Sequence, residues 1–401
     1  MERLARRLGV PDAVVIGLGA MLGAGVFVVF APAASAAGGA GLLVALALAG
    51  FVAFCNATSS ARLAARHPES GGTYVYGRER LHPFAGFVAG WGFVVGKTAS
   101  CAAMALTIGA YLWPGRARLV AVLAVVAVTA VNLRGIGKTA AVTRALVAVV
   151  LTVLAVVAVT GAPQVVPDRL TVSADVPTHG VLTAAGLLFF AFAGYARIAT
   201  LGEEVRDPER TIPRAVPLAL GAVLAVYLTL AVVTLGVLGP DRLAASTAPL
   251  VDVVTAAGHP GLAWLVRAGA AVAVTGVLLS LLAGVGRTTL AMARRHDLPD
   301  ALAAVHPRHR VPHRAELAVA AVVAVVVALG DVRGAIGFSS CTVLVYYAIT
   351  NAAALTLGPS LLAALGLVGC LVLAVSLPVT SVLAGFGVLA LGALWYAVRH
   401  R

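Results

Sequence analysis

The chain has 401 residues, of which 61% are hydrophobic and 11% are charged, and its mean hydropathy is +1.00. A soluble domain carries about 25% charged residues and about half apolar residues. So much apolar surface cannot be hidden from water in a fold of this length, so the composition predicts a membrane protein with several crossings. The net charge of +13 comes from basic residues in short loops without interleaved aromatic residues. We therefore expect the lipid bilayer, and not nucleic acid, as the partner of these residues.

Long apolar runs follow one another along the whole chain. A transmembrane helix needs about 20 mostly apolar residues, which leaves room for about 12 crossings. The sequence predicts crossings near residues 13–36, 41–63, 84–113, 118–133, 141–161, 181–201, 215–238, 261–290, 315–330, 334–357, 360–377 and 380–398.

Lysine and arginine residues are unevenly divided between the segments that join these runs. Of the 29, 21 fall in one set of alternating segments and 6 in the other. Cytoplasmic loops are enriched in Lys and Arg, so this bias predicts a multi-pass protein of the cytoplasmic membrane with both termini in the cytoplasm. The remaining two residues, Lys97 and Arg197, lie inside predicted crossings.

Residue types that carry enzyme or metal chemistry are sparse. The nine histidines lie in loops or at the ends of runs, and the four cysteines lie in apolar runs without CxxC spacing. We expect no metal site, no disulfide framework and no cofactor, and the absence of a Walker motif argues against an ATP-driven pump. A polytopic membrane enzyme or a channel remains as an alternative. The nearest approach to a polar cluster at one membrane face is Glu203, Glu204 and Asp207.

Two of the apolar runs, those near residues 13–36 and 181–201, contain residues that favour a break in the helix. Glycine in a helix interior costs about 1 kcal/mol, and the first run has glycines at 17, 19, 23 and 25. Backbone that leaves helical geometry inside a bilayer must line a cavity or pack against protein. Glycine-interrupted crossings at corresponding places in two halves point to a transporter site. Close helix packing through Gly19 and Gly23 is the alternative interpretation.

Three segments resemble the amino acid–polyamine–organocation (APC) permeases. The first crossing, GLGAMLGAGVF, resembles the unwound first helix of that family. Residues 189–214 resemble its sixth helix and the following loop, and read FFAFAGYARIATLGEEVRDPERTIPR. Residues 280–299 resemble the end of its eighth helix, and read SLLAGVGRTTLAMARRHDLP.

The resemblance implies an all-α membrane protein of about 12 transmembrane helices with discontinuous helices 1 and 6. Two inverted five-helix repeats would span residues 1–161 and 162–357, and two additional C-terminal helices would occupy residues 358–401. It also implies a secondary transporter that takes up or exchanges amino acids or related amines by alternating access. Whether transport is coupled to protons stays open.

A zwitterion needs partners for both of its charges when it leaves water. A half-helix that begins near Gly23 would present free N–H groups to a carboxylate, and a half-helix that ends near Met21 would present free carbonyls to an amine. The resemblance implies that residues 23–25 hold the carboxylate, and that carbonyls of the first and sixth crossings hold the amine. The substrate-binding residues that we expect are Met21, Gly23, Ala24, Gly25, Phe190, Ala191, Ala193 and Tyr195.

The pattern departs from the family where coupling is concerned. Similar proton-coupled permeases carry a lysine in the fifth crossing, and the corresponding stretch 148–153 has none. Charge at bilayer depth costs a few kcal/mol, so Lys97 and Arg197 become the candidates for coupling or gating. Lysine is the better proton carrier, because arginine stays charged. Structural roles are the alternative: Lys97 would bond to carbonyls of the crossings, and Arg197 would pair with Glu203 or Glu204. The two glutamates would also pair with basic residues of neighbouring loops, as an inner gate.

Overall fold

The computed structural model describes residues 8–67, 71–135, 140–171, 177–199 and 205–400. These ranges are built of helices, with a single isolated parallel bridge between Leu8 and Val205. Ten helical segments are long and apolar enough to cross a membrane. The expected class, an all-α protein with many membrane crossings, is confirmed.

The helices in the first part of the chain fall largely in the expected runs. They are α1 (Val10–Met21), α2 (Ala24–Val28), α3 (Phe30–Ala37), α4 (Gly41–Arg66), α5 (Thr73–Arg80), α6 (Pro83–Leu112), η1 (Pro114–Arg116), α7 (Ala117–Leu133), α8 (Ala140–Gly161), η2 (Ala162–Gln164) and η3 (Pro167–Leu170).

The second part continues in the same way. Its helices are α9 (Thr178–Phe192), η4 (Ala193–Tyr195), α10 (Ala196–Ala199), α11 (Pro208–Ala245), α12 (Pro249–Ala256), η5 (Pro260–Leu262), α13 (Ala263–Arg294), η6 (Asp300–Ala303), α14 (His313–Leu329), α15 (Val332–Leu355), α16 (Leu361–Ser376) and α17 (Val379–Arg399).

Two of the twelve expected crossings are not among these ten segments. Helix α14 has 17 residues and α16 has 16, and they occupy the runs predicted near 315–330 and 360–377. A straight helix of 16 residues is about 24 Å long, which is less than the ~30 Å of a typical hydrocarbon core. The count of twelve crossings therefore depends on these two helices.

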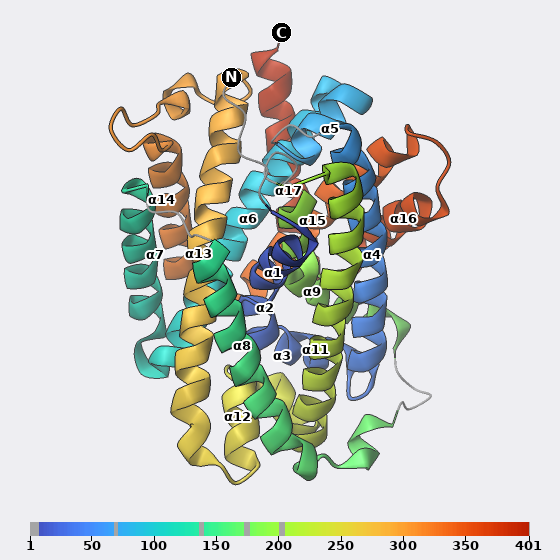
Figure 1. The fold of residues 1–401 in the computed structure, drawn as a ribbon, viewed down its shortest axis with the longest axis vertical. Coiled ribbons are helices and arrows are strands. Elements are labelled where there is room, and N and C mark those ends of the chain that lie inside the picture. Colours follow the sequence, from blue (N-terminus) through green and yellow to red (C-terminus); the bar gives the residue numbers. More distant parts are fainter. Residues whose placement is uncertain (1–7, 68–70, 136–139, 172–176, 200–204, 401) are drawn as a thin grey trace.

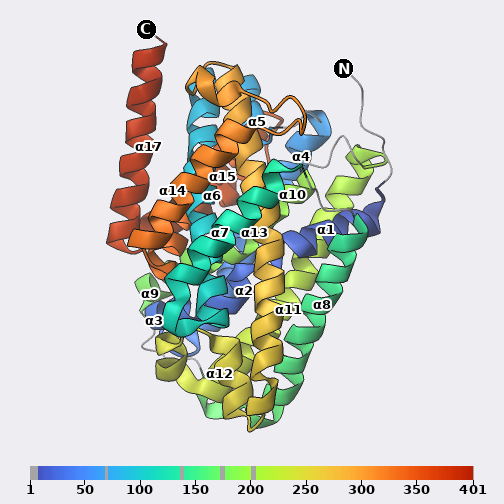
Figure 2. The same ribbon diagram turned by 90° about the vertical axis from the view of Figure 1, so that its left-hand side faces the viewer.

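Helix α1 runs from the edge of the molecule toward its centre, as Figure 2 shows. Helix α1 packs against α8 and α11, and α9 packs against α3, α4 and α15. The remaining long helices surround this pair, with α6 in contact with both α13 and α15. Residues 21–28 of the first crossing and 189–193 of the sixth are buried, as a break in a membrane helix requires.

The connections rich in basic residues gather at one end of the molecule. Helix α5, the α13–α14 connection and the C-terminal end of α17 lie together there, whereas α12 lies at the opposite end (Figures 1 and 2). Helix α5 carries Arg78 and Arg80, the α13–α14 connection carries Arg308 and Arg310, and α17 ends at Arg399. Basic segments that are far apart in the sequence therefore lie together at one end of the molecule.

Candidate functional site

The first crossing is broken at the predicted place. Helix α1 ends at Met21 and α2 begins at Ala24. Between them, Leu22 (φ −78°, ψ 47°) and Gly23 (φ −104°, ψ −142°) leave helical geometry. Helices α2 and α3 are joined through Val29, whose φ of −70° and ψ of −26° are helical, so they form one half-helix.

The sixth crossing is broken as well. Helix α9 ends at Phe192, a 3₁₀ turn runs over Ala193–Tyr195, and the four-residue helix α10 follows. A 3₁₀ turn exchanges i→i+4 bonds for shorter i→i+3 bonds, which changes the set of backbone groups left for other partners. The interruption expected in the first crossing is present, and in the sixth crossing the α-helix gives way to a 3₁₀ turn at Ala193–Tyr195.

The two breaks lie against each other. A Cβ atom added at Gly194 would collide with the carbonyl oxygen of Ala20, and one added at Gly25 would lie 2.6 Å from the Cα atom of Ala191. Real Cβ atoms do not approach other atoms so closely, so the backbones meet only because these two residues are glycines. The glycines of the sequence therefore serve close approach between the broken crossings as well as the breaks themselves.

A tyrosine of α11 joins the two breaks. The Tyr227 hydroxyl donates to backbone carbonyls of both crossings: its oxygen lies 2.6 Å from the Met21 oxygen and 3.1 Å from the Ala191 oxygen. The side chain is fully buried, and its ring packs edge-on against Phe192 at 5.1 Å between centroids. Sequence reasoning missed Tyr227. The available signal was a tyrosine in the middle of an apolar run, because a hydroxyl there needs a buried acceptor.

Lys97 lies halfway along α6 and points at the break in the sixth crossing. Its Nζ atom donates to the carbonyl oxygen of Ala193 at 3.4 Å, and the Tyr347 hydroxyl of α15 donates to the same oxygen at 3.4 Å. The lysine is 7% exposed. The structure therefore brings one of the candidate coupling residues next to one of the candidate substrate-binding residues.

The expected free carbonyls are not free. The oxygens of Met21, Ala191 and Ala193 each accept a hydrogen bond from a protein side chain. An unpaired carbonyl in a water-free interior costs several kcal/mol, which explains why side chains from three different helices reach them. A carbonyl oxygen has two lone pairs, so the Met21 oxygen can still accept from a second donor, whereas the Ala193 oxygen already has two side-chain donors.

The other residues expected to bind substrate surround the same place. Gly23, Ala24 and Gly25 form the start of α2 and are buried. Phe190 is 8% exposed, and the ring of Tyr195 lies 5.1 Å from that of Tyr347. The expected residues are thus close together in space, although they come from two crossings that are far apart in the sequence.

The remaining candidates for coupling or gating are Arg197, Glu203 and Glu204. Arg197 lies in α10 beyond the break, and its side chain is exposed. Glu203 and Glu204 lie outside the described residues. The two intramembrane cations of the sequence therefore have different surroundings, because only Lys97 is buried at the breaks.

A narrow cavity of about 20 Å³ lies beside the break in the first crossing, between α1, α8 and α13. It is lined by Gly19, Leu22, Val147, Val277 and others, and it is wide enough for about one water molecule. An amino acid is much larger, so the helices around this cavity must separate before such a molecule could occupy it.

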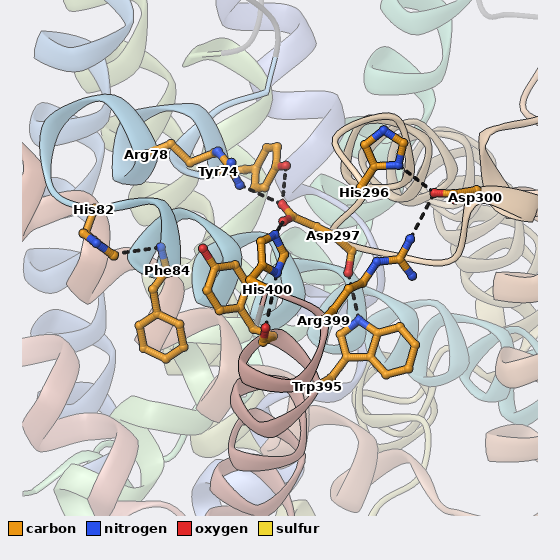
Figure 3. A network of polar contacts seen from close by, with 11 residues as sticks. Tyr74, Arg78, His82, Phe84, His296, Asp297, Asp300, Trp395, Arg399 and His400 are labelled. Atoms are coloured by element: carbon orange, nitrogen blue, oxygen red, sulfur yellow. Dashed lines mark hydrogen bonds and ion pairs between the residues drawn. The ribbon is translucent and has the colours of Figure 1, made fainter.

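A second polar cluster lies at the basic end of the molecule (Figure 3). The fully buried Asp297 carboxylate accepts hydrogen bonds from the Tyr74 hydroxyl at 2.6 Å and from Arg78 Nη1 at 2.8 Å. The His400 Nε2 atom lies 3.5 Å from its other oxygen, and the Trp395 indole donates to the Asp297 carbonyl at 2.9 Å. This cluster connects α5 and the segment after α13 to the end of α17.

The surroundings of the Tyr74 hydroxyl keep it protonated. Burial and the adjacent Asp297 carboxylate raise the pKa of Tyr74, so the hydroxyl stays protonated and donates. Sequence reasoning noted Asp297 only within a segment resembling the family. Its partners come from residues 74–78 and 395–400, and no spacing along the chain indicates that pairing.

Discontinuous crossings that meet at the centre of a helical bundle define a class of membrane transporters, in which broken helices form the solute site. The family comparison agrees, since the model of the amino acid permease family matches residues 12–384. The chain belongs to that family, and the resemblance found in the sequence is confirmed.

Similar proteins include transporters with and without an assigned substrate. The chain is 63% identical to an uncharacterised transporter of Mycobacterium tuberculosis (strain H37Rv), over 100% of the chain and 92% of that protein. It is 25% identical to a branched-chain amino acid permease of Bacillus subtilis, over 78% of the chain and 72% of that protein. It is 27% identical to the vacuolar cationic amino acid transporter 2 of Arabidopsis thaliana, over 89% of the chain and 60% of that protein.

Proposed function

We propose that the chain is a secondary active transporter that moves amino acids or related amines across the cytoplasmic membrane by alternating access. The meeting of the two broken crossings carries this proposal. It places backbone N–H and C=O groups of both crossings in one buried region, where they can pair with the carboxylate and the amine of a substrate. The names of two similar proteins, a branched-chain permease and a cationic amino acid transporter, support the same substrate class.

The proposed architecture follows the family. Residues 1–161 and 162–357 would form two inverted repeats, with 358–401 as two further helices, and both termini would lie in the cytoplasm. The gathering of α5, the α13–α14 connection and the end of α17 at one basic end supports this orientation. Within the site, residues 23–25 would bind the carboxylate, and the second lone pair of the Met21 carbonyl would accept from the amine. The Ala193 oxygen would accept from the amine in competition with Lys97 and Tyr347.

Counterflow of radiolabelled amino acids into proteoliposomes tests the proposed function. Vesicles preloaded with one unlabelled amino acid should accumulate the labelled form transiently and saturably, and vesicles without protein should not. The assay needs no knowledge of the coupling ion, because exchange drives accumulation. If no amino acid or amine produces counterflow, the proposed function is wrong.

Proton coupling is proposed through Lys97, and exchange without ion coupling is the second candidate. The second candidate is favoured by the absence of a lysine in residues 148–153. If Lys97 carries the proton, Lys97→Ala should make the initial rate of uptake much less dependent on external pH. The exposed Arg308 of the α13–α14 connection provides a control, because Arg308→Ala removes a cation at the basic end of the molecule and should keep the wild-type pH profile. An unchanged profile in Lys97→Ala would favour uncoupled exchange.

A further inference from the structure

We propose that Lys97 makes this site selective for amino acids with a net negative charge, those that carry a carboxylate in the side chain. The inference rests on the proposed transport function and names the substrate class within it. It is carried by one juxtaposition: the ammonium group of Lys97 lies against the carbonyl of Ala193, at the break where substrate is expected.

Lys97 is an isolated charge among the residues that the structure describes. Among the described residues only three charged side chains are buried, and the other two are carboxylates, Asp297 and Glu316. Asp297 is paired with Arg78 and lies after the end of α13, and Glu316 lies in the first turn of α14. Lys97 lies 14 residues into α6, about 21 Å from its start, and forms no ion pair with a carboxylate in the part of the chain that the structure describes.

The hydrogen-bond partners of Lys97 do not neutralise it. Its Nζ atom meets a carbonyl oxygen, and the Tyr347 hydroxyl shares that oxygen as a second donor. Carbonyl dipoles stabilise an ammonium group but leave its full charge in a region of low dielectric constant. A substrate with one surplus negative charge would supply the missing counter-ion.

Net charge then ranks the three classes of amino acid. With the ammonium of Lys97 in place, an anionic substrate gives a neutral enclosed site, a zwitterion leaves one positive charge, and a cationic substrate leaves two. Each uncompensated charge inside the membrane weakens binding, and a tenfold change in affinity corresponds to about 1.4 kcal/mol. The expected order of affinity is therefore anionic, then zwitterionic, then cationic.

The carbonyls that already accept hydrogen bonds from side chains support the same order of affinity. The ammonium of any α-amino acid must share Ala193 with Lys97 and Tyr347, and must share Met21 with Tyr227. A second positive group close to Lys97 is repelled by it. The side-chain carboxylate of an anionic amino acid offsets that repulsion by pairing directly with Nζ.

The experiment compares L-glutamate, L-leucine and L-arginine as unlabelled competitors and as labelled substrates in proteoliposome counterflow. For the wild-type protein we expect L-glutamate to bind at least about tenfold more tightly than L-arginine. Lys97→Met removes the charge and keeps the length of the side chain, and it should reduce this ratio to about one or below. Lys97→Arg keeps the charge and should preserve the order. Arg308→Met, in the exposed α13–α14 connection, is the control for loss of a remote cation.

The wild-type ranking tests the inference even if a variant fails to fold. Counterflow of L-leucine or L-arginine with equal or higher affinity than L-glutamate would overturn it and leave the proposed transport function intact. A glutamate preference that persists in folded Lys97→Met would overturn the assignment to Lys97. If the protein is folded, as its thermal transition shows, and none of the three gives counterflow, the inference is contradicted. If no amino acid or amine at all gives counterflow, the proposed function itself is contradicted.

Discussion

Gly25→Val should reduce uptake by more than about tenfold while leaving a folded protein in the membrane. The Cβ atom alone would lie 2.6 Å from both the Cα and the Cβ atom of Ala191, so α2 and α9 must move apart to accept it. Overpacking of this kind costs about 1–3 kcal/mol, and it falls directly on the geometry of the two breaks. Initial rates of uptake in proteoliposomes, normalised to the amount of folded protein, measure the effect.

Gly221→Val is the matched control for this variant. Gly221 lies in α11, is exposed, and an added Cβ there meets no atom within 4 Å. Both variants exchange glycine for valine in a membrane-spanning segment, so an effect of helix propensity alone would be common to them. Equal uptake by folded Gly25→Val and Gly221→Val would show that the tight approach of residues 25 and 191 is not needed for transport.

Asp297→Asn should lower the free energy of unfolding by about 2–3 kcal/mol. The fully buried Asp297 carboxylate accepts from Tyr74 and Arg78 and lies next to His400. Asparagine has a single acceptor oxygen and no charge, so the Arg78 guanidinium loses its counter-ion in a largely buried place. Denaturant-dependent thermal unfolding in detergent would measure the loss.

The neighbouring Asp300 offers a matched control in the same loop. It pairs with His296 at 2.9 Å and with Arg399 at 3.0 Å, but its side chain is 65% exposed. Exposed ion pairs contribute about 0–1 kcal/mol, so Asp300→Asn should change stability little. If the two variants unfold alike, burial of the Asp297 cluster does not stabilise the junction of α5 with α17.

The sequence was sufficient for the class of protein and for the place of the breaks. Long apolar runs must cross a bilayer, because no other environment accepts so many apolar side chains. The glycines between residues 17 and 25 indicated the interruption of the first crossing, which the structure has at residues 22–23. The sixth crossing was indicated by its resemblance to the family, and a 3₁₀ turn lies there at Ala193–Tyr195. These signals are local, since each depends on residues that are close together in the chain.

The partners of the broken segments were decided by tertiary structure alone. Tyr227 reaches Met21 across 206 positions, Tyr347 reaches Ala193 across 154, and Lys97 reaches the same residue across 96. An amphipathic period or a motif indicates which face of a helix is apolar, but it does not specify which distant helix that face meets. Packing of the whole bundle fixes those neighbours, and so it also decides which buried charge faces the substrate region and which backbone carbonyls already have donors.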